Sequence, residues 1–339
     1  MSSIDKVNIQ LYTTSLTIFM SQEVISQKIH NRITGAKKPL FVMHKKPDGD
    51  ALGSALAMAN WLESEGKDAH IYCYDSAPKH YQFISKFERI KNDPAIFNHE
   101  DIDLVVVLDS GDLMYAGIDN ILKGIDKNLP VINIDHHATN QQYGEINLVD
   151  PNASSTAEVV YNFLSHNNVN IDKHIATALL VGILTDTTNF TNPGTTVSSM
   201  RVASELISYG ARTNEISKNI LKNKSIDALR LWGKTLSRLE ENKELGMAIA
   251  VIKKEDFADV QAPGEAVEGV SNFLNALLNV KLVLVLRETD DGFVKGSFRS
   301  TDVDVSKIAQ TLGGGGHKKA AGFTIKGKLE KINGKWTVV

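Results

Sequence analysis

The sequence predicts an α/β protein whose N-terminal domain has a mainly parallel sheet flanked by helices. Short apolar runs recur at residues 40–43, 103–108 and 131–134. Segments of helical length and helical apolar spacing separate or follow these runs. Strands that alternate with helices form βαβ units, which build parallel sheets. From about residue 246 the pattern changes to shorter strands with a hairpin signal, so we expect a second, smaller α/β domain there.

The size and charge of the chain narrow the class of protein. A chain of 339 residues exceeds one typical domain. We therefore expect a first domain at residues 21–215, a helical linker at 216–245 and a second domain at 246–339. The hydrophobic content of 42% and the net charge of −3 are typical of a soluble globular protein. This charge balance argues against a long, sequence-independent contact with duplex DNA.

Cysteine content and hydropathy predict the location of the protein. The single cysteine, Cys73, excludes an intramolecular disulfide and is typical of a reducing cytosol. No run is long enough to cross a bilayer, so we expect a cytoplasmic protein without membrane attachment. Residues 1–19 have no clear signal-peptide cleavage site and are interpreted as an upstream extension without an assigned function.

The first domain is expected to begin with the strand at 40–43, followed by a turn and a helix at 55–65. A second strand is predicted at 69–74, before the strands at 103–108 and 131–134. Helical spacing then recurs in five further segments: 156–165, 173–185, 197–209, 214–219 and 226–240.

The second domain is expected to combine short strands with two helices. The predicted elements are strands at 247–252, 281–287 and 293–299 and helices at 265–278 and 305–312. Asp290-Asp-Gly292 indicates a hairpin between the last two of these strands. The pair Asn333-Gly334 predicts a final hairpin.

His44, Asp48 and Asp50 lie in the turn between the first strand and the helix after it. In an open α/β sheet, ligands bind at the carboxyl ends of the strands. Imidazole and carboxylate together are the ligand set of Mn²⁺, Zn²⁺ or Fe²⁺. The turn is therefore a candidate metal site, with an ordinary Pro-Asp-Gly-Asp surface turn as the alternative.

The same two side-chain types recur at the ends of later predicted elements. With the first turn they form one set: His44, Asp48, Asp50, Asp109, Asp135, His136, His137 and Asp186. Burying these charges without cations is unfavourable. Two divalent ions about 3.5–4 Å apart would offset the charge, activate a water and stabilise a phosphoryl transition state.

Each member of this set also has a purely structural alternative. Asp109 is compatible with a helix N-cap, and Asp186 with a helix-terminal turn. The Asp135–His137 stretch is compatible with a hydrogen-bonded strand end. We favour one shared site, because it explains all of these matching positions at once.

A glycine run near the C-terminus is a second candidate site. Gly313–Gly316, followed by His317, permits a backbone nest whose amides face an anion. It is not a Walker loop, because the Lys-Ser/Thr pair is absent. The alternative is a flexible turn. Arg299, at the end of a predicted strand, is expected to pair with a phosphate or with a surface acid.

In their order along the chain, these motifs resemble the DHH phosphoesterase superfamily with its DHH-associated C-terminal domain. The closest resemblance is to the bacterial nanoRNase and pAp phosphatase (NrnA-like) group. The matching stretches are residues 44–54, 108–112, 134–140, 150–158, 182–187 and 313–322. The resemblance implies an active site in a cleft between the two domains.

The resemblance also implies the metal ligands. The first metal would be held by His44, Asp48 and Asp109, and the second by Asp50, Asp109, His136 and Asp186. Asp109 would bridge the two divalent ions, which are most often Mn²⁺ in this family.

The remaining implied roles concern catalysis and substrate binding. His137 would face the scissile phosphate, as a stabiliser or as the proton donor to the leaving oxygen, and Asp135 would orient an imidazole. The substrate's phosphates and sugar would be bound by residues of both domains: His137, Arg299, Gly314, Gly315, Gly316 and His317.

Two positions depart from the family pattern. Thr188 stands where the family often has Gly, beside the second metal. Tyr115 stands where an Arg is common, three positions after Asp112. All the implied metal ligands are present, so an active enzyme is expected.

The function implied is hydrolysis of short oligoribonucleotides, including pApA, to mononucleotides and of pAp to AMP, by attack of a metal-bound hydroxide. A related alternative is hydrolysis of cyclic di-AMP. An alternative of another class is a nucleotide-binding sensor without catalysis, which would usually lack a metal carboxylate. A family II pyrophosphatase and a RecJ-type exonuclease are disfavoured by the glycine run and by the short, slightly acidic chain. A homodimer is expected from the family.

Overall fold

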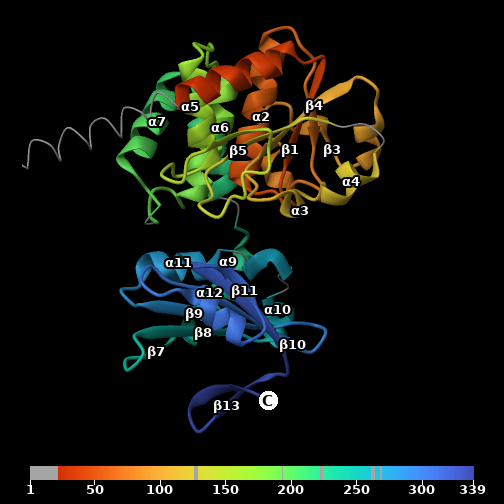
Figure 1. Cartoon of the computed structure of the whole chain (residues 1–339). Coiled ribbons are helices and arrows are strands. Elements are labelled where there is room, and N and C mark those ends of the chain that lie inside the picture. The colour runs from red at the N-terminus through yellow and green to blue at the C-terminus, as the bar shows by residue number, and fades with distance from the viewer. Residues whose placement is uncertain (1–21, 126–128, 193, 222–223, 261–263, 268) are drawn as a thin grey trace, which may run out of the picture. The chain divides into compact units, whose positions relative to one another are not determined.

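The computed structural model describes most of the chain. The described residues are 22–125, 129–192, 194–221, 224–260, 264–267 and 269–339. The chain divides into two compact units, residues 1–222 and 223–339 (Figure 1). Among the described residues, no helix is long and apolar enough to span a membrane. The extension predicted at residues 1–19 lies outside the described residues.

The first unit is built on a six-stranded parallel sheet with the order β3-β2-β1-β4-β5-β6. Its strands are β1 (Lys38–Met43), β2 (His70–Tyr72), β3 (Ile90–Lys91), β4 (Ile102–Leu108), β5 (Val131–Asp135) and β6 (Ile146–Val149). The four strands predicted in this unit are confirmed. Two further strands were not predicted: β3, which has only two residues, and β6, in which only Leu148 is buried.

Helices cover both faces of this parallel sheet. They are residues 22–35, α2 (Gly49–Ser64), α3 (Leu113–Ala116), α4 (Asp119–Gly124), α5 (Thr156–His166), α6 (Lys173–Asp186), α7 (Val197–Ser208) and α8 (Thr213–Ile216). Phe41 and Met43 of β1 pack in a core with α2, α5 and α6. Leu40 and Val42 face the opposite core. Successive side chains on a strand point to opposite faces, so the apolar run buries both.

The strand order locates the ligand-binding edge of the first unit. β1 lies between β2 and β4, so the chain moves outward in one direction through β2 and in the other through β4. Such a reversal is the point at which open α/β sheets bind ligands, beyond the carboxyl ends of the strands. Here those ends are Met43 of β1 and Leu108 of β4, which are paired in register.

The second unit is built on a mixed six-stranded sheet with the order β11-β12-β10-β9-β8-β7. Its strands are β7 (Glu240–Asn242), β8 (Met247–Ile252), β9 (Leu282–Glu288), β10 (Phe293–Arg299), β11 (Gly315–His317) and β12 (Ala320–Lys326). A separate hairpin follows, formed by β13 (Leu329–Ile332) and β14 (Lys335–Val338). The predicted smaller α/β unit and both predicted hairpins are confirmed.

Helices of the second unit pack on opposite faces of this sheet. One core contains residues of α9 (Ile226–Ser237), α10 (Lys254–Val260) and α11 (Val270–Leu277), and the other contains α12 (Val305–Thr311). α9 lies in the segment predicted as a linker, yet its Ala228 and Leu231 are buried in the core of this unit.

Two elements of the second unit differ from the sequence-based expectation. The helix expected from residue 265 begins at Val270, after a 3₁₀ turn and Gly269 with a φ of +86°. The glycine run is not an open nest throughout, because Gly315–His317 pairs with β12 as an edge strand. A Cβ on Gly314 would lie 2.1 Å from the carbonyl oxygen of Gly322, so close packing of the backbone requires glycine there.

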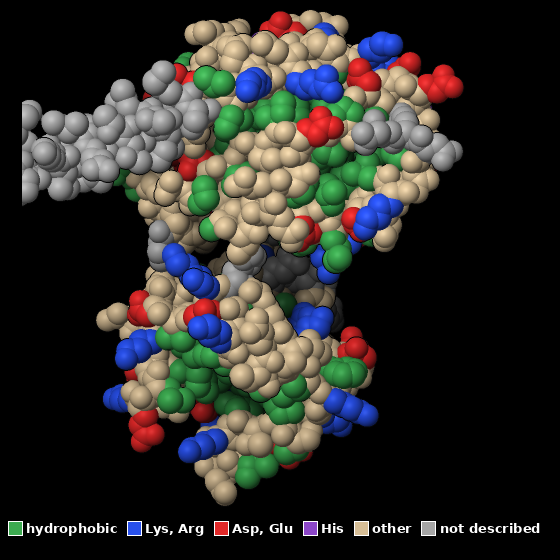
Figure 2. Space-filling view, in the orientation of Figure 1, with side chains coloured by type: hydrophobic (Ala, Val, Ile, Leu, Met, Phe, Trp, Pro, Cys, Tyr) green, Lys and Arg blue, Asp and Glu red, His purple; other side chains and the backbone are tan. Residues whose placement is uncertain are grey.

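The face of the molecule seen in Figure 2 carries mixed charge. Lys and Arg side chains are interspersed with Asp and Glu over both units. The described residues of this face therefore form no extended basic surface of the kind that binds long duplex nucleic acid.

Candidate metal centre

The predicted His and Asp residues of the first unit meet at the carboxyl edge of its sheet. His44 follows β1, Asp109 follows β4, and Asp135 is the last residue of β5. Leu108 pairs with Met43 on one side and with Ile134 on the other. The next residue of each strand is therefore at the same level, which brings the three polar side chains together.

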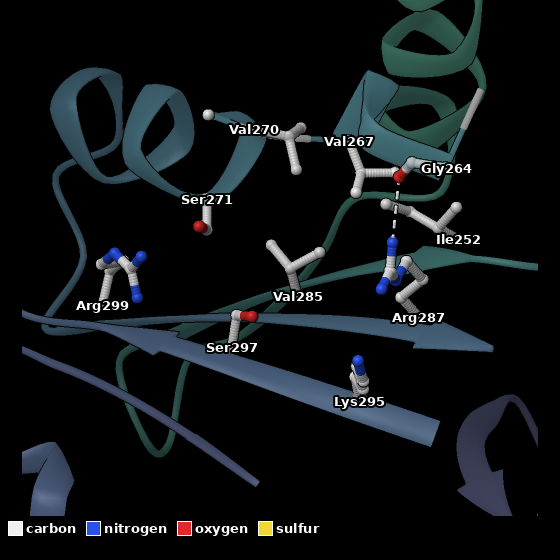
Figure 3. A pocket seen from close by; sticks show the side chains of 11 residues that line it. Ile252, Gly264, Val267, Val270, Ser271, Val285, Arg287, Lys295, Ser297 and Arg299 are labelled. Carbon is white, nitrogen blue, oxygen red and sulfur yellow. Dashed lines mark hydrogen bonds between the residues drawn. The ribbon is translucent and has the colours of Figure 1, made fainter. Parts of the chain in front are cut away.

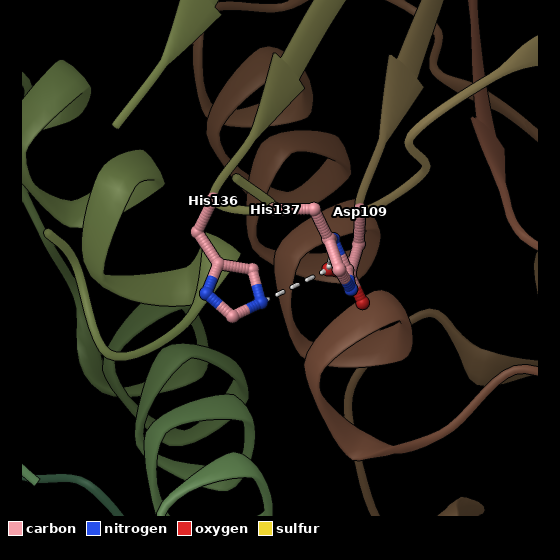
Figure 4. Close-up of side chains that lie close together, drawn as sticks. All are labelled: Asp109, His136 and His137. Atoms are coloured by element: carbon pink, nitrogen blue, oxygen red, sulfur yellow. Dashed lines mark ion pairs between the residues drawn. The ribbon is translucent and has the colours of Figure 1, made fainter. Parts of the chain in front are cut away.

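Asp109 lies at the centre of this group. Its side chain is almost fully buried. One carboxylate oxygen, Oδ2, lies 3.5 Å from Nε2 of His44, and the other, Oδ1, lies 3.8 Å from Nε2 of His136 (Figure 4). Its φ of +58° is rare for a residue with a side chain and is typical of strained functional positions. The two oxygens thus face opposite imidazoles.

The donor atoms fall into three overlapping sets. One contains His44, Asp48 and Asp109, a second contains Asp50, His136 and Asp186, and a third contains Asp109, His136 and His137. The first two include every residue named as a ligand from the sequence. Within each set the atoms lie within 4.8 Å of one another. Imidazole nitrogens and carboxylate oxygens are suitable donors for Mn²⁺ and similar divalent ions. The structure therefore brings together all six residues named as ligands from the sequence.

The start of α2 places two of these carboxylates. Asp48 is the N-cap, and its Oδ1 accepts hydrogen bonds from the backbone N–H groups of Asp50 at 3.0 Å and Ala51 at 3.1 Å. A Cβ on Gly49 would lie 2.4 Å from Oγ1 of Thr185. Glycine at this position therefore lets α2 begin directly against the end of α6, where Asp186 lies.

Asp50 is held by the N-terminus of α5. Its oxygens accept hydrogen bonds from the backbone N–H groups of Thr156 at 2.6 Å and Ala157 at 2.8 Å. A Cβ on Gly182 would lie 2.7 Å from Oδ1 of Asp50, so glycine in α6 leaves room for this carboxylate. Burial and the negative charges of Asp109 and other nearby acids raise the pKa of Asp50 well above its usual value.

The imidazole of His44 presents Nε2 to the carboxylates. Its Nδ1 lies 2.7 Å from the carbonyl oxygen of Lys45, so Nδ1–H donates there and Nε2 is left to act as a ligand. Burial lowers the pKa of His44, but the carboxylates of Asp109 and Asp48 outweigh this effect and raise it to about 12. A proton on this ring thus compensates the carboxylates, as a divalent cation would.

The second donor set also contains mutually repelling carboxylates. Burial raises the pKa of Asp186 to about 6, and the carboxylates of Asp109 and Asp48 add to this increase, against the opposing effect of His136. Nε2 of His136 lies 3.6 Å from Oδ2 of Asp186. A cation bound at these carboxylates would favour the charged form of Asp186.

Asp135 and His137 form a hydrogen-bonded pair beside Asp109. Nδ1 of His137 lies 2.7 Å from Oδ1 of the fully buried Asp135. Burial lowers the pKa of His137, but the carboxylates of Asp135 and Asp109 outweigh it and raise the pKa to about 9. Because Nδ1–H donates to Asp135, the orientation of the His137 ring is fixed.

Two residues to which the sequence analysis assigned no role support the centre. The hydroxyl of Thr156 donates to Oδ1 of Asp109 at 2.8 Å, and the amide of Asn140 donates to Oδ2 of Asp135 at 2.5 Å. Both residues lie in stretches that resemble the family, 134–140 and 150–158, but their contacts with the two aspartates depend on packing that the sequence does not show.

The two departures from the family pattern both lie beside the donor residues. The ring of Tyr115 stacks on that of His44, with centroids 4.9 Å apart and planes at 20°. Thr188, two residues after Asp186, has a φ of +50°, and Asn189 and Phe190 are also left-handed. A β-branched residue in this conformation is strained, and glycine would not be.

The other predicted site residues belong to the second unit. Arg299 ends β10, and the glycine run leads into β11. Arg299 and His317 both pair with Ala320 of β12, one from each side. The guanidinium of Arg299 donates from Nε to Oδ1 of Asn272 at 2.6 Å. The structure therefore brings Arg299 and the glycine run together within the second unit.

Two family models and several known proteins match the chain. The model described as "DHH family, N-terminal domain" matches residues 39–183, and the one described as "DHHA1 domain" matches 245–335. A Thermus thermophilus protein named bifunctional oligoribonuclease and PAP phosphatase NrnA is 34% identical over 291 residues, covering 85% of each chain.

Two further matches extend this comparison. A Listeria monocytogenes protein named cyclic-di-AMP phosphodiesterase PdeA is 29% identical over 323 residues, which cover 89% of this chain and 47% of that protein. The solved structure of an exopolyphosphatase-related protein from Bacteroides fragilis matches with a TM-score of 0.81 and 25% identity, covering 90% of this chain and 92% of the other. The Listeria protein is thus about twice as long as the region it shares.

Proposed function

The chain belongs to the DHH family of phosphoesterases, and from this premise we propose that it hydrolyses short oligoribonucleotides to mononucleotides and pAp to AMP. The family predicted from the motifs is confirmed, and so is a hydrolase acting on phosphoesters. The relative from Thermus thermophilus, named for both activities, supports this pair of substrates.

The observation that carries the proposal is the position of Asp109 between two donor sets. One of its oxygens faces His44 and the other faces His136. We assign the first metal to His44, Asp48 and Asp109 and the second to Asp50, Asp109, His136 and Asp186. Two divalent ions, for which we propose Mn²⁺, supply an activated water and stabilise charge in the phosphoryl transition state when bound. The raised pKa of Asp50 supports a site that requires cations.

The chain's own residues then complete the reaction. We assign His137 to the scissile phosphate, where Nε2–H donates to the leaving oxygen. Its pKa of about 9 keeps the ring protonated near neutral pH. Asp135 fixes the ring through Nδ1, and Asn140 in turn holds Asp135. This arrangement orients one imidazole proton without using it for metal binding.

Substrate binding is assigned to His137 and to residues of the second unit. These are Arg299, Gly314, Gly315, Gly316 and His317, with Arg299 contacting a substrate phosphate. Arg299 forms no ion pair among the described residues, which supports a role in binding an anion. Homodimerisation and a cytoplasmic location stay predictions from the sequence.

Hydrolysis of cyclic di-AMP is the second candidate. It is favoured by the match of 89% of this chain to the Listeria protein named for that activity. A catalytically silent sensor is disfavoured, because the structure brings every proposed metal ligand into one of the first two donor sets.

The proposal is tested by a hydrolysis panel with Mn²⁺ on a short RNA, pApA, pAp, cyclic di-AMP and pyrophosphate. We expect AMP from pApA and from the RNA, and phosphate from pAp, with no turnover after chelation. A preference for cyclic di-AMP would support the second candidate. Bound metal without turnover of any of these compounds would contradict both.

A further inference from the structure

A pocket of about 610 Å³ lies within the second unit. It is bounded by β9 and β10 on one side and by the start of α11 and the 3₁₀ turn Gly264–Val267 on the other. Figure 3 shows Arg299 and Ser271 at one end and Arg287 and Lys295 at the other. A volume of this size is typical of sites for small molecules.

The pocket has positively charged side chains at both ends. Within the part of the chain that the structure describes, no ion pair is formed by Arg287, Lys295 or Arg299. Arg287 donates one hydrogen bond to the carbonyl oxygen of Gly264 at 3.1 Å, which leaves its other N–H donors available. Unpaired guanidinium and ammonium groups around a pocket are suited to phosphate oxygens.

The register of the two strands sets the spacing of these charges. Lys295 pairs directly with Arg287, so these two cations stand side by side. Arg299 lies four residues further along β10, on the same face, because side chains alternate along a strand. A rise of about 3.3 Å per residue separates the two ends by about 13 Å. Adjacent phosphates of an extended single strand lie about half that distance apart.

The floor between the two ends is suited to a nucleoside. Ser297 pairs with Val285 midway between the cationic ends. Val285, Val267 and Val270 give an apolar surface, and Ser297 and Ser271 offer hydroxyl groups. Apolar contact with a few placed polar groups is the usual composition of a nucleoside-binding surface.

We propose that the Arg287–Lys295 end binds a second phosphate of an oligonucleotide, two linkages from the phosphate bound by Arg299. This inference rests on the proposed function and deepens it. The pocket distinguishes substrates by length, because a trinucleotide such as pApApA reaches both cationic ends and pAp does not. Arg287 and Lys295 are then specificity-determining residues, and the chemistry at the metal centre is unaffected by them.

The test compares the double variant R287Q/K295Q with wild type on pApApA and pAp under Mn²⁺. A charge-assisted phosphate contact contributes enough that its loss lowers the pApApA-to-pAp ratio of kcat/KM by about tenfold or more. The loss should lie in KM for the longer substrate. The matched control is K307Q, because Lys307 is exposed on α12, which packs on the opposite face of the sheet. The control should leave the ratio at the wild-type value.

A binding measurement separates this inference from the proposed function. Calorimetric titration of pApApA into the full-length D109N variant, with and without R287Q/K295Q, should show weaker binding when the two cations are removed. Binding that is equally tight with and without the two cations, or an equal loss of kcat/KM on pApApA and pAp, would overturn the inference. If wild type hydrolyses no RNA but the calorimetric difference is present, the proposed function fails and the pocket assignment stands.

Discussion

The two units carry opposite charges at their candidate sites. In the first unit, Asp50 and Asp109 are buried at the sheet edge, and no described Lys or Arg forms an ion pair with them. In the second unit, Arg287, Lys295 and Arg299 line a pocket without an ion pair among the described residues. Buried negative charge in the first unit lowers stability unless a cation binds there. This is consistent with our proposal that each set binds a ligand of opposite sign.

Asp256 in the second unit is a buried carboxylate with a structural role, and it has hydrogen-bond partners for both oxygens. It is 1% exposed, like Asp50. Arg238 donates to both of its oxygens, and the backbone N–H of Lys253 donates to Oδ2 at 2.8 Å. Burial raises the pKa of Asp256, but these bonds outweigh it and lower the pKa below its usual value. The two aspartates therefore differ in partners and not in burial.

The largest effect is expected from Asp109→Asn, which should lower kcat by about 10³-fold or more. Loss of the shared ligand removes several kcal/mol of transition-state stabilisation by the metal pair. The backbone should tolerate the change, because Asn adopts a positive φ more readily than most residues. The measurements are kcat and the metal content of each protein, with Asp256→Asn as the control. Normal turnover in Asp109→Asn would disprove the bridging role.

Removal of metal should destabilise the first unit and leave the stability of the second unit unchanged. With metal at a hundredfold excess over its Kd, binding stabilises the first unit by about 2.7 kcal/mol, and chelation removes that stabilisation. Hydrogen exchange should increase in α2 and α6 after chelation and stay constant in β8 and β9. Equal changes in both units would show that the carboxylates of the first unit are not a separate metal site.

A smaller effect is expected from Thr156→Val, which removes the hydroxyl donor to Asp109 and keeps the side-chain shape. Loss of a hydrogen bond to a metal ligand typically lowers metal affinity or activity by about 10–100-fold. Thr156→Ser should restore most of this loss. The measurement is the Mn²⁺ concentration for half-maximal activity, and identical values for all three proteins would rule out a positioning role.

The smallest effect is expected from Asp256→Asn, about 1–2 kcal/mol of unfolding free energy. Breaking a fully buried ion pair costs more, but Arg238 is partly exposed. Because the folded-state pKa of Asp256 is lowered, its stabilisation is present above the unfolded-state pKa of about 3.9 and disappears as the pH falls through the folded-state value.

Denaturant unfolding between pH 3 and pH 7 tests this sign. The difference between wild type and Asp256→Asn should be largest at neutral pH and should shrink in acid. Turnover should be retained while the variant is folded, because Asp256 is neither in a donor set of the first unit nor among the residues assigned to substrate binding. A difference that grows in acid would contradict the assigned role of the Arg238 pair.

Local sequence determined the elements that carry the metal centre. The runs at β1, β4 and β5 are apolar because both faces of a parallel sheet are buried, and each ends directly in His or Asp. That pattern needs only neighbouring residues, so His44, Asp109 and Asp135–His137 could be singled out before any fold was known. β6 was not predicted from the sequence, because it is only partly buried and lacks the apolar pattern.

The tertiary structure alone decided which of these residues have partners. The hydroxyl of Thr156 reaches Asp109 from 47 positions away, and Arg287 stands beside Lys295 only because β9 and β10 pair in that register. Sequence spacing cannot specify such contacts, since they depend on strand register and on close packing at Gly49, Gly182 and Gly314. Local sequence thus determined which residue types lie at the site. Long-range packing determined which of their charges have partners.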